Sequence, residues 1–555
     1  MNPIIKQALF MICLGVLPLV NAAEKSKTTQ AEPELVSTQT LTGNSFLLTQ
    51  VDLRDRTDAH DNPAVVSTQP ISPNAKVEMT GNLFIIKNES TDQGHIFVRR
   101  SPMPTSRPFA PKVDITFELV NNQLNVELFK DDYEQEENLW TVLPFSGGAF
   151  ECTAALQNWQ RSLRPDTPIH RIPSFIINTW GDRSRDSAIN ETFLLQEIDA
   201  AKEIGADVLR IDDGWQTGLS GNSAFKGPMK TKGLQGFWGV SSSFWQVNKE
   251  RLPNGLKPIL EKGEKEGVKI GLWYAPDSEN EFANWEKDVM TLLELHKTHG
   301  INHFKIDGLD IESPLAQERL NHLLSAVRTQ SNDEILLLID LTGKHKRPGF
   351  LGSISEGNLF VQNRYTDRGS YWPHRTLRNL WNLSRWVDPG RLRFEFLNNQ
   401  RNATHKKYKK EPFAPVNYPA DYLFATVMFS NPLGWFEAQN LPAEYRKKMA
   451  PLSKIWREHR EQIFSANIAP IGQEPSGSSW TGFASVSENR EELYLLCLRE
   501  FSENADYTYR LPVELKDDYE IEILYGDGTA SFSQQGFSVS IDDEPGILFL
   551  KLKVK

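Results

Sequence analysis

The feature that most constrains the fold is a repeat of apolar and amphipathic segments between about residues 170 and 437. Apolar runs of strand length alternate with segments whose apolar residues recur at helical spacing. Several of the helical segments stop at a glycine, as at Gly205, Gly267 and Gly300. The predicted strands are 174–180, 208–213, 268–275, 303–307, 335–341, 359–363, 392–396 and 434–437. This pattern predicts an α/β fold built on a closed, parallel (β/α)8 TIM barrel.

The alternative to a barrel is an open, doubly wound parallel sheet. Such a sheet carries a glycine-rich phosphate turn after its first strand. No such turn follows residues 174–180, so the barrel is favoured.

Both ends of the chain are predicted to form antiparallel β domains. Residues 24 to about 165 hold short, partly alternating segments, and Asn121-Asn122 separates two of them, 115–120 and 124–128, as a hairpin turn would. Short strands return from about residue 461. The predicted domains are a β-sandwich at 24–165, the barrel at 166–460 and a C-terminal β-sandwich at 461–555.

The first 23 residues resemble a secretory signal peptide. Lys6 precedes an apolar run from residue 8 to 20, and Asn21-Ala22-Ala23 offers small residues for cleavage. A membrane anchor is the alternative, but the run is short for a span and contains Pro18. We therefore expect export to the periplasm or the medium, with no membrane span after cleavage.

Cysteine content and charge exclude several classes of function. Beyond the predicted signal peptide the chain has only Cys152 and Cys497, which argues against a disulfide framework and a cysteine-rich metal site. The net charge of −11 argues against a nucleic-acid partner, because a phosphate backbone requires a basic surface. The sequence leaves open whether the chain forms an oligomer.

Carboxylates and aromatic residues recur where the predicted strands end, which is where barrel enzymes place their active sites. Together with two basic residues, the candidates are, in chain order, Trp180, Asp212, Asp213, Trp215, Trp273, Lys305, Asp307, Asp340, Arg364, Asp367 and Glu437. One such aspartate alone would more often cap a helix, but the repetition at one rim argues for a site. Lys305 and Asp307 also point to the same side of one strand.

This combination predicts a carbohydrate substrate. Indole rings stack on sugar faces, carboxylates accept hydrogen bonds from sugar hydroxyls, and two carboxyl groups can cleave a glycosidic bond. No cluster with metal-ligand spacing is present in the sequence, so neither a metal nor another cofactor is predicted.

Several motifs resemble those of melibiase-type α-galactosidases, glycoside hydrolase families 36 and 27. They are Asn178-Thr179-Trp180, Asp212-Asp213-Gly214-Trp215, the strand connection made of the segments 251–258 and 267–274, and Phe304-Lys305-Ile306-Asp307. The resemblance covers roughly residues 170–310, and the three-part layout is similar to that of family 36. The four motifs in this order are specific, whereas each alone would be weak.

The resemblance implies a role for each residue of the motifs. Asp307 would be the nucleophile that forms a covalent glycosyl-enzyme. Lys305 would bind a ring hydroxyl and help to keep Asp307 ionised. Asp212 and Asp213 would hold the hydroxyls at C4 and C6, and Trp180, Trp215 and Trp273 would wall the pocket.

The sequence departs from family 36 after the fifth and sixth strands. Family 36 places its acid/base in a Trp-Thr-Ser-Asp-like motif, whereas residues 361–367 read Val-Gln-Asn-Arg-Tyr-Thr-Asp. Arg364 with Asp367 resembles family 27 instead, so Asp367 is the expected acid/base and Glu437 the alternative. Asp340 stands near the place of a cysteine- and glycine-rich motif of family 36, so it is a candidate for substrate binding.

Three functions remain open from the sequence. The first is a retaining, exo-acting α-galactosidase. The second is a related glycosidase or transglycosylase acting on β-L-arabinopyranosides or α-N-acetylgalactosaminides. The third is a carbohydrate-binding barrel without catalysis.

Overall fold

The computed structural model describes residues 33–54, 57–59, 61–104, 107, 112–130, 139–343, 349–515, 518–533 and 536–555. The predicted signal peptide, residues 1–23, lies outside the described residues. No helix in the described ranges is long and apolar enough to cross a membrane.

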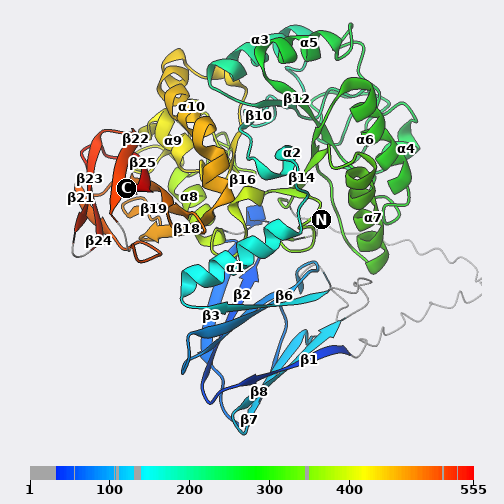
Figure 1. Cartoon of the computed structure of the whole chain (residues 1–555). Coiled ribbons are helices and arrows are strands. Elements are labelled where there is room, and N and C mark those ends of the chain that lie inside the picture. The colour runs from blue at the N-terminus through cyan, green and yellow to red at the C-terminus, as the bar shows by residue number, and fades with distance from the viewer. Residues whose placement is uncertain are drawn as a thin grey trace, which may run out of the picture.

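The centre of the molecule is a closed barrel of parallel strands, as the sequence predicts (Figure 1). Each strand pairs with the next one along the chain, and the last pairs with the first. The strands are β10 (Ile176–Asn178), β11 (Val208–Ile211), β12 (Lys269–Tyr274), β13 (His303–Ile306), β14 (Leu336–Asp340), β15 (Gly357–Phe360), β16 (Leu392–Phe396) and β17 (Asn431–Gly434).

Helices surround the barrel. Because they cover its outer face, the strands are buried on both faces and read as continuous apolar runs. The Asn190 side chain accepts a hydrogen bond from the Phe193 amide, 2.9 Å away, and so caps the first of these helices. The helices are α3 (Glu191–Glu203), α4 (Phe237–Val240), α5 (Lys257–Glu266), α6 (Trp285–His299), α7 (Pro314–Gln330), α8 (Pro373–Leu383), α9 (Ala420–Ala425) and α10 (Ala443–Ser465).

The eighth strand lies earlier in the chain than predicted. The expected range was 434–437, but β17 spans Asn431–Gly434. Pro432 breaks the usual strand pattern because it has no N–H to donate. The Asn431 side chain supports this strand by donating to the carbonyls of Gly390 and Leu392, at 2.8 and 3.2 Å.

The N-terminal part forms two antiparallel sheets that enclose a core of their own. Asn121 and Asn122, with φ of 51° and 59°, make the predicted two-residue hairpin turn between β7 and β8. The strands are β1 (Glu34–Thr42), β2 (Phe46–Leu53), β3 (Ala64–Pro70), β4 (Lys76–Met79), β5 (Leu83–Asn88), β6 (Gln93–Arg99), β7 (Ile115–Val120), β8 (Gln123–Lys130) and β9 (Trp140–Ser146).

The C-terminal part also consists of antiparallel sheets, which lie beside the barrel (Figure 1). Pro470, Gly482 and two serines make the strand pattern of β18, β19 and β23 weak in the sequence. The strands are β18 (Asn467–Gly472), β19 (Trp480–Val486), β20 (Glu492–Arg499), β21 (Asp506–Tyr509), β22 (Tyr519–Tyr525), β23 (Gly528–Ser533), β24 (Gly536–Ile541) and β25 (Gly546–Val554).

Helix α1 (Ala149–Ser162) joins the three parts and is followed by the short α2 (Pro168–Arg171). Arg161 donates to Asp388 Oδ1 at 3.2 Å and to the Ala466 carbonyl at 2.7 Å. The second guanidinium beside Asp388 is that of Arg164, 3.5 Å away. The buried Asp388 carboxylate therefore fixes α1 to the barrel, and Arg161 extends this link to the C-terminal sheet.

Replacing Asp388 by alanine is expected to lower the free energy of unfolding by about 3–5 kcal/mol, because it leaves two largely buried guanidiniums without their carboxylate. Urea denaturation followed by tryptophan fluorescence measures the loss. The matched control is Asp199→Ala, which removes an ion pair whose aspartate is 61% exposed and should cost about 1 kcal/mol or less. Equal losses in the two variants would contradict the proposed role of Asp388.

Candidate active site

A cavity of about 340 Å³ opens at the carboxyl ends of the barrel strands. This volume lies within the range of small-molecule sites, of the order of 300–1,000 Å³. The cavity is lined by Trp180, Arg183, Arg185, Asp212, Asp213, Gly221, Asn222, Trp273, Lys305, Asp307, Asn363, Tyr365 and Arg368. The closed barrel thus brings together residues from strands that are far apart in the sequence.

Lys305 is the electrostatic centre of this cavity. Its Nζ lies 3.5 Å from Asp212 Oδ2, 3.6 Å from Asp307 Oδ2 and 3.8 Å from Asp340 Oδ2. Burial alone would lower the pKa of Lys305, but the three carboxylates together raise that pKa above its ordinary value. The amine therefore stays charged at neutral pH.

The Asp307 carboxylate is held from several sides and still faces the cavity. Trp273 Nε1 donates to Oδ2 at 3.2 Å, and the Gly308 amide donates to Oδ1 at 2.7 Å. Gly308 has a φ of +71°, and a Cβ there would lie 2.9 Å from Leu234 Cβ, so a glycine is needed. The Asp307 side chain remains 17% exposed.

The neighbouring carboxylates Asp212 and Asp213 have different surroundings. Asp212 Oδ2 accepts a hydrogen bond from Asn178 Nδ2 at 2.9 Å and also faces Lys305. Asp213 instead accepts hydrogen bonds from Gln216, at 2.6 Å, and from Ser220. Because burial outweighs these hydrogen bonds, the pKa of Asp213 is raised to about 7. At neutral pH Asp213 therefore exists in both protonation states.

Two of the three predicted wall tryptophans, Trp180 and Trp273, line the cavity. Trp215 does not: it is fully buried and donates from Nε1 to the Trp273 carbonyl at 2.8 Å. It therefore supports the wall from behind. Gly181 brings the Trp180 loop close to the eighth strand, since a Cβ there would lie 1.9 Å from the Trp435 carbonyl oxygen.

Lys305 lines the cavity, and two aromatic rings pack around its amine. The Lys305 Nζ lies 5.1 Å from the ring centre of Trp435 and 5.2 Å from that of Phe360. Asp340, a predicted substrate-binding residue, is 2% exposed and contacts Lys305, but it is not among the described residues that line the cavity.

The predicted acid/base, Asp367, lies next to Arg368, which lines the cavity, but Asp367 itself is not among the described residues that line it. Its side chain is 38% exposed, and Oδ2 lies 3.7 Å from Arg183 Nη1. The adjacent Arg364 is directed elsewhere: it donates to the Asp58 carbonyl at 2.9 Å, and the Asp58 carboxylate lies 3.6 Å away. Arg364 thus binds the N-terminal part of the chain instead of reaching the cavity.

The alternative acid, Glu437, lies among polar groups of its own. It accepts a hydrogen bond from Asn440, which also donates to Asp182 at 3.0 Å. Burial, with the added effect of the Asp182 charge, raises the pKa of Glu437 above its ordinary value. Glu437 is not among the described residues that line the cavity.

Sequence analysis missed several residues of the cavity, above all Arg183, Arg185, Tyr365 and Arg368. Arg183 and Arg185 follow the Asn178-Thr179-Trp180 motif directly, and Tyr365 and Arg368 flank Asp367. Position next to these motifs was the signal that could have identified them.

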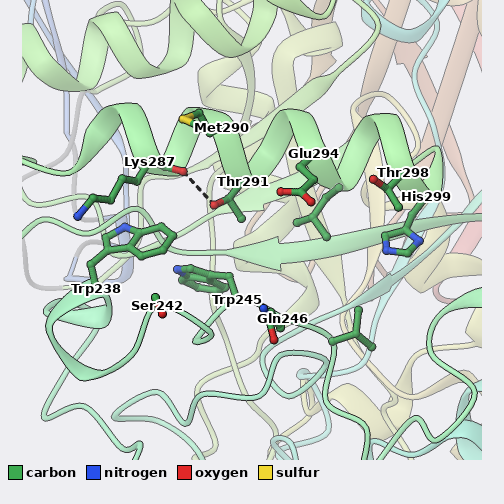
Figure 2. A pocket seen from close by; sticks show the side chains of 12 residues that line it. Trp238, Ser242, Trp245, Gln246, Lys287, Met290, Thr291, Glu294, Thr298 and His299 are labelled. Atoms are coloured by element: carbon green, nitrogen blue, oxygen red, sulfur yellow. Dashed lines mark hydrogen bonds between the residues drawn. The ribbon is translucent and has the colours of Figure 1, made fainter.

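A second cavity, of about 420 Å³, lies outside the barrel between α6 and the loop that follows α4 (Figure 2). Trp238 and Trp245 face Lys287, Thr291 and Glu294 across it. The Trp245 ring centre lies 5.7 Å from that of Trp273, so this groove backs onto the wall of the barrel cavity. Glu294 is its one carboxylate among the described lining residues, so it lacks the paired carboxyl groups that bond cleavage requires.

Part of the chain is similar in sequence to known α-galactosidases. The Melibiase family model matches residues 140–307. Alpha-galactosidase 2 of Pediococcus pentosaceus is 26% identical over 138 residues, which are 25% of this chain and 16% of that relative. An alpha-galactosidase of Escherichia coli is 24% identical over 127 residues, 22% of this chain and 15% of the relative. The matched region thus spans less than a fifth of each of these curated relatives.

Solved structures share the fold over nearly the whole chain. A GH36 α-galactosidase of Geobacillus stearothermophilus, in complex with 1-deoxygalactonojirimycin, has a TM-score of 0.64 at 14% identity, covering 93% of this chain and 76% of its own. The α-galactosidase of Lactobacillus brevis has a TM-score of 0.64 at 10% identity, with 93% and 75% covered. The expected resemblance to melibiase-type α-galactosidases is confirmed.

The raised pKa of Asp213 predicts a pH dependence of stability. Its folded-state pKa, about 7, exceeds its unfolded value, so its contribution to stability is complete below about pH 4 and is lost as the pH rises through 7. The Asp213→Asn variant has no group that titrates at this position. Relative to wild type, its urea midpoint should therefore rise between pH 4 and 7 and level off above 7. Asp199→Asn, at an exposed position, should show no such trend between pH 5 and 8. An Asp213→Asn difference independent of pH would refute the assignment.

Proposed function

We propose that the chain is a retaining, exo-acting glycoside hydrolase that releases α-linked galactose from oligo- or polysaccharides. The observation that carries the proposal is the Lys305 amine between three carboxylates, one of which, Asp307, faces the cavity beside Trp273. The α-galactosidases among the relatives support the choice of sugar. Among the structural neighbours, one was solved with raffinose.

In the proposed first step, the Asp307 carboxylate attacks the anomeric carbon. The bond from this carbon to the leaving oxygen breaks, and Asp367 gives its proton to that oxygen. A covalent ester between the sugar and Asp307 remains. In the second step, Asp367 takes a proton from water, the water oxygen attacks the anomeric carbon, and Asp307 leaves as a carboxylate. This sequence retains the anomeric configuration.

The surroundings of Asp307 suit a nucleophile. Lys305 and the indole N–H of Trp273 both lie at Oδ2, and the Gly308 amide holds Oδ1. A nearby cation and hydrogen bonds to the charged form favour an ionised carboxylate. Hydrogen bonds that fix the rotamer also keep the attacking oxygen in place before substrate arrives.

The form of the cavity supports exo action. Lys305 lines the cavity, and the Phe360 and Trp435 rings pack within 5.2 Å of its amine, which favours a cavity closed at this end and open to a chain end. In this arrangement Asp212 would accept hydrogen bonds from sugar hydroxyls, Lys305 would donate one, and Trp180 or Trp273 would contact the sugar face.

Export of the protein, expected from residues 1–23, stays a prediction.

Replacement of Asp307 by asparagine is expected to abolish release of nitrophenol from 4-nitrophenyl α-galactoside, because the amide cannot form the glycosyl ester. Wild-type turnover followed by proton NMR should show α-galactose as the first product. Circular dichroism controls for folding of the variant. If the variant retains activity, Asp307 is not the nucleophile. If β-galactose is the first product, the reaction inverts the anomeric configuration instead of retaining it.

The effect on the rate of removing the Asp367 carboxyl should depend on the leaving group. For an α-galactoside of another sugar, Asp367→Asn should lower kcat/KM by about 10²–10⁴-fold, the usual contribution of a general acid. For 2,4-dinitrophenyl α-galactoside the loss in the first step should be much smaller, since that phenolate departs without a proton. Glu437→Gln is the matched comparison. If Glu437→Gln shows the leaving-group dependence and Asp367→Asn does not, the acid is Glu437.

A further inference from the structure

The rim of the cavity carries three positively charged arginines that no step of the proposed bond cleavage uses. Arg183, Arg185 and Arg368 all line the cavity near its mouth. The guanidiniums of Arg183 and Arg368 lie 4.7 and 5.0 Å from the ring centre of Tyr365. Tyr365 thus gathers two of the three cations at one place.

These arginines are incompletely neutralised by the protein. Within the described part of the chain, Arg185 and Arg368 are exposed and have no ion-pair partner. Arg183 is the best-paired of the three, but Asp367 lies 3.7 Å from its Nη1, beyond hydrogen-bond distance. That Nη1 is buried and has no hydrogen-bond partner among the described residues. Donors are therefore left available for a ligand.

The loop that presents Arg183 and Arg185 is held in an unfavourable backbone conformation. Both residues have positive φ, 61° and 54°. Such a conformation costs a non-glycine residue free energy, and residues of this kind cluster at active sites and ligand clamps. A glycine at either position would relieve the cost but would lose the guanidinium.

Acidic and basic side chains lie at different depths in the cavity. The acidic groups Asp212 and Asp213 are 2% exposed, at the floor, where the galactose ring would bind. An anion placed there would be repelled. The arginines lie at the mouth, where the sugar on the other side of the cleaved bond would emerge, and Asp367 offsets only one of their charges.

We propose that the natural substrate is an anionic glycan, with a carboxylate or sulfate ester on the sugar next to the released galactose, and that Arg183, Arg185 and Arg368 bind this group. Guanidiniums recognise both anions through paired N–H donors. The proposal rests on the proposed function, because it assigns the mouth of the cavity to the leaving sugar.

The test compares α-galactosyl disaccharides whose second sugar is glucose, glucuronate or glucose sulfate. Galactose release gives kcat/KM for each, and the ratio of anionic to neutral substrate isolates the effect of charge. Hydrogen bonds to charged groups predict a ratio of about tenfold or more. The ratio should fall as salt is raised, because rim charges are screened. The two anionic arms distinguish carboxylate from sulfate.

The double variant Arg185→Gln, Arg368→Gln should lower the ratio about tenfold or more, because it removes two of the three guanidiniums. Both side chains are exposed, and circular dichroism checks that the variant folds. The control is Lys257→Gln, which removes a cation 80% exposed on α5 and should leave the ratio unchanged. A wild-type ratio near one, or a ratio that the double variant leaves intact, would overturn the proposal.

Binding of the same disaccharides to Asp307→Asn, measured by calorimetry, provides the ratio without turnover. Absence of galactose release by wild type would remove the proposed function. Absence of a charge preference in binding would remove the anionic substrate. The two failures are therefore seen in different measurements.

Discussion

The buried amine of Lys305 is the interaction on which the site depends. A lone ammonium group at this depth would be costly, and three carboxylates within 3.8 Å offset that cost. The carboxylates come from the ends of β11, β13 and β14. In the barrel β13 lies next to β14 and only β12 separates it from β11, and the parallel direction of these strands is what brings their ends around one amine.

Floor and rim are built from different parts of the fold. The floor consists of residues at strand ends, whose positions are fixed by the barrel hydrogen bonds. The rim consists of the loops after β10 and β15, which carry Arg183, Arg185, Tyr365 and Arg368. Loops tolerate change better than strands do. The proposed nucleophile Asp307 and its neighbour Lys305 are therefore tied to the rigid part of the molecule, whereas the proposed acid/base Asp367 and the arginines stand in loops that can vary.

Much of the fold could be predicted because barrel strands are buried on both faces and read as uninterrupted apolar runs. Where a residue interrupts the run, prediction failed, as at Pro432 in β17. The residues that meet at the floor were also predictable, since parallel strands end on one side. The direction of Trp215 was not, because sequence spacing does not tell a lining tryptophan from one behind it. Arg364 was placed wrongly because its partner, Asp58, lies 306 residues away. The arginines of the rim were missed because single charges in loops usually face solvent.

The contact at Asp58 has a consequence for how this protein can diversify. Asp58 belongs to the N-terminal part, yet its carboxylate accepts a hydrogen bond at 2.9 Å from the backbone of Asn363, a residue that lines the cavity. Recombination that joined this barrel to a foreign sandwich would remove the support of the loop after β15. The two modules are therefore expected to be inherited together, and a change of specificity can arise from a substitution in the module that carries none of the barrel strands.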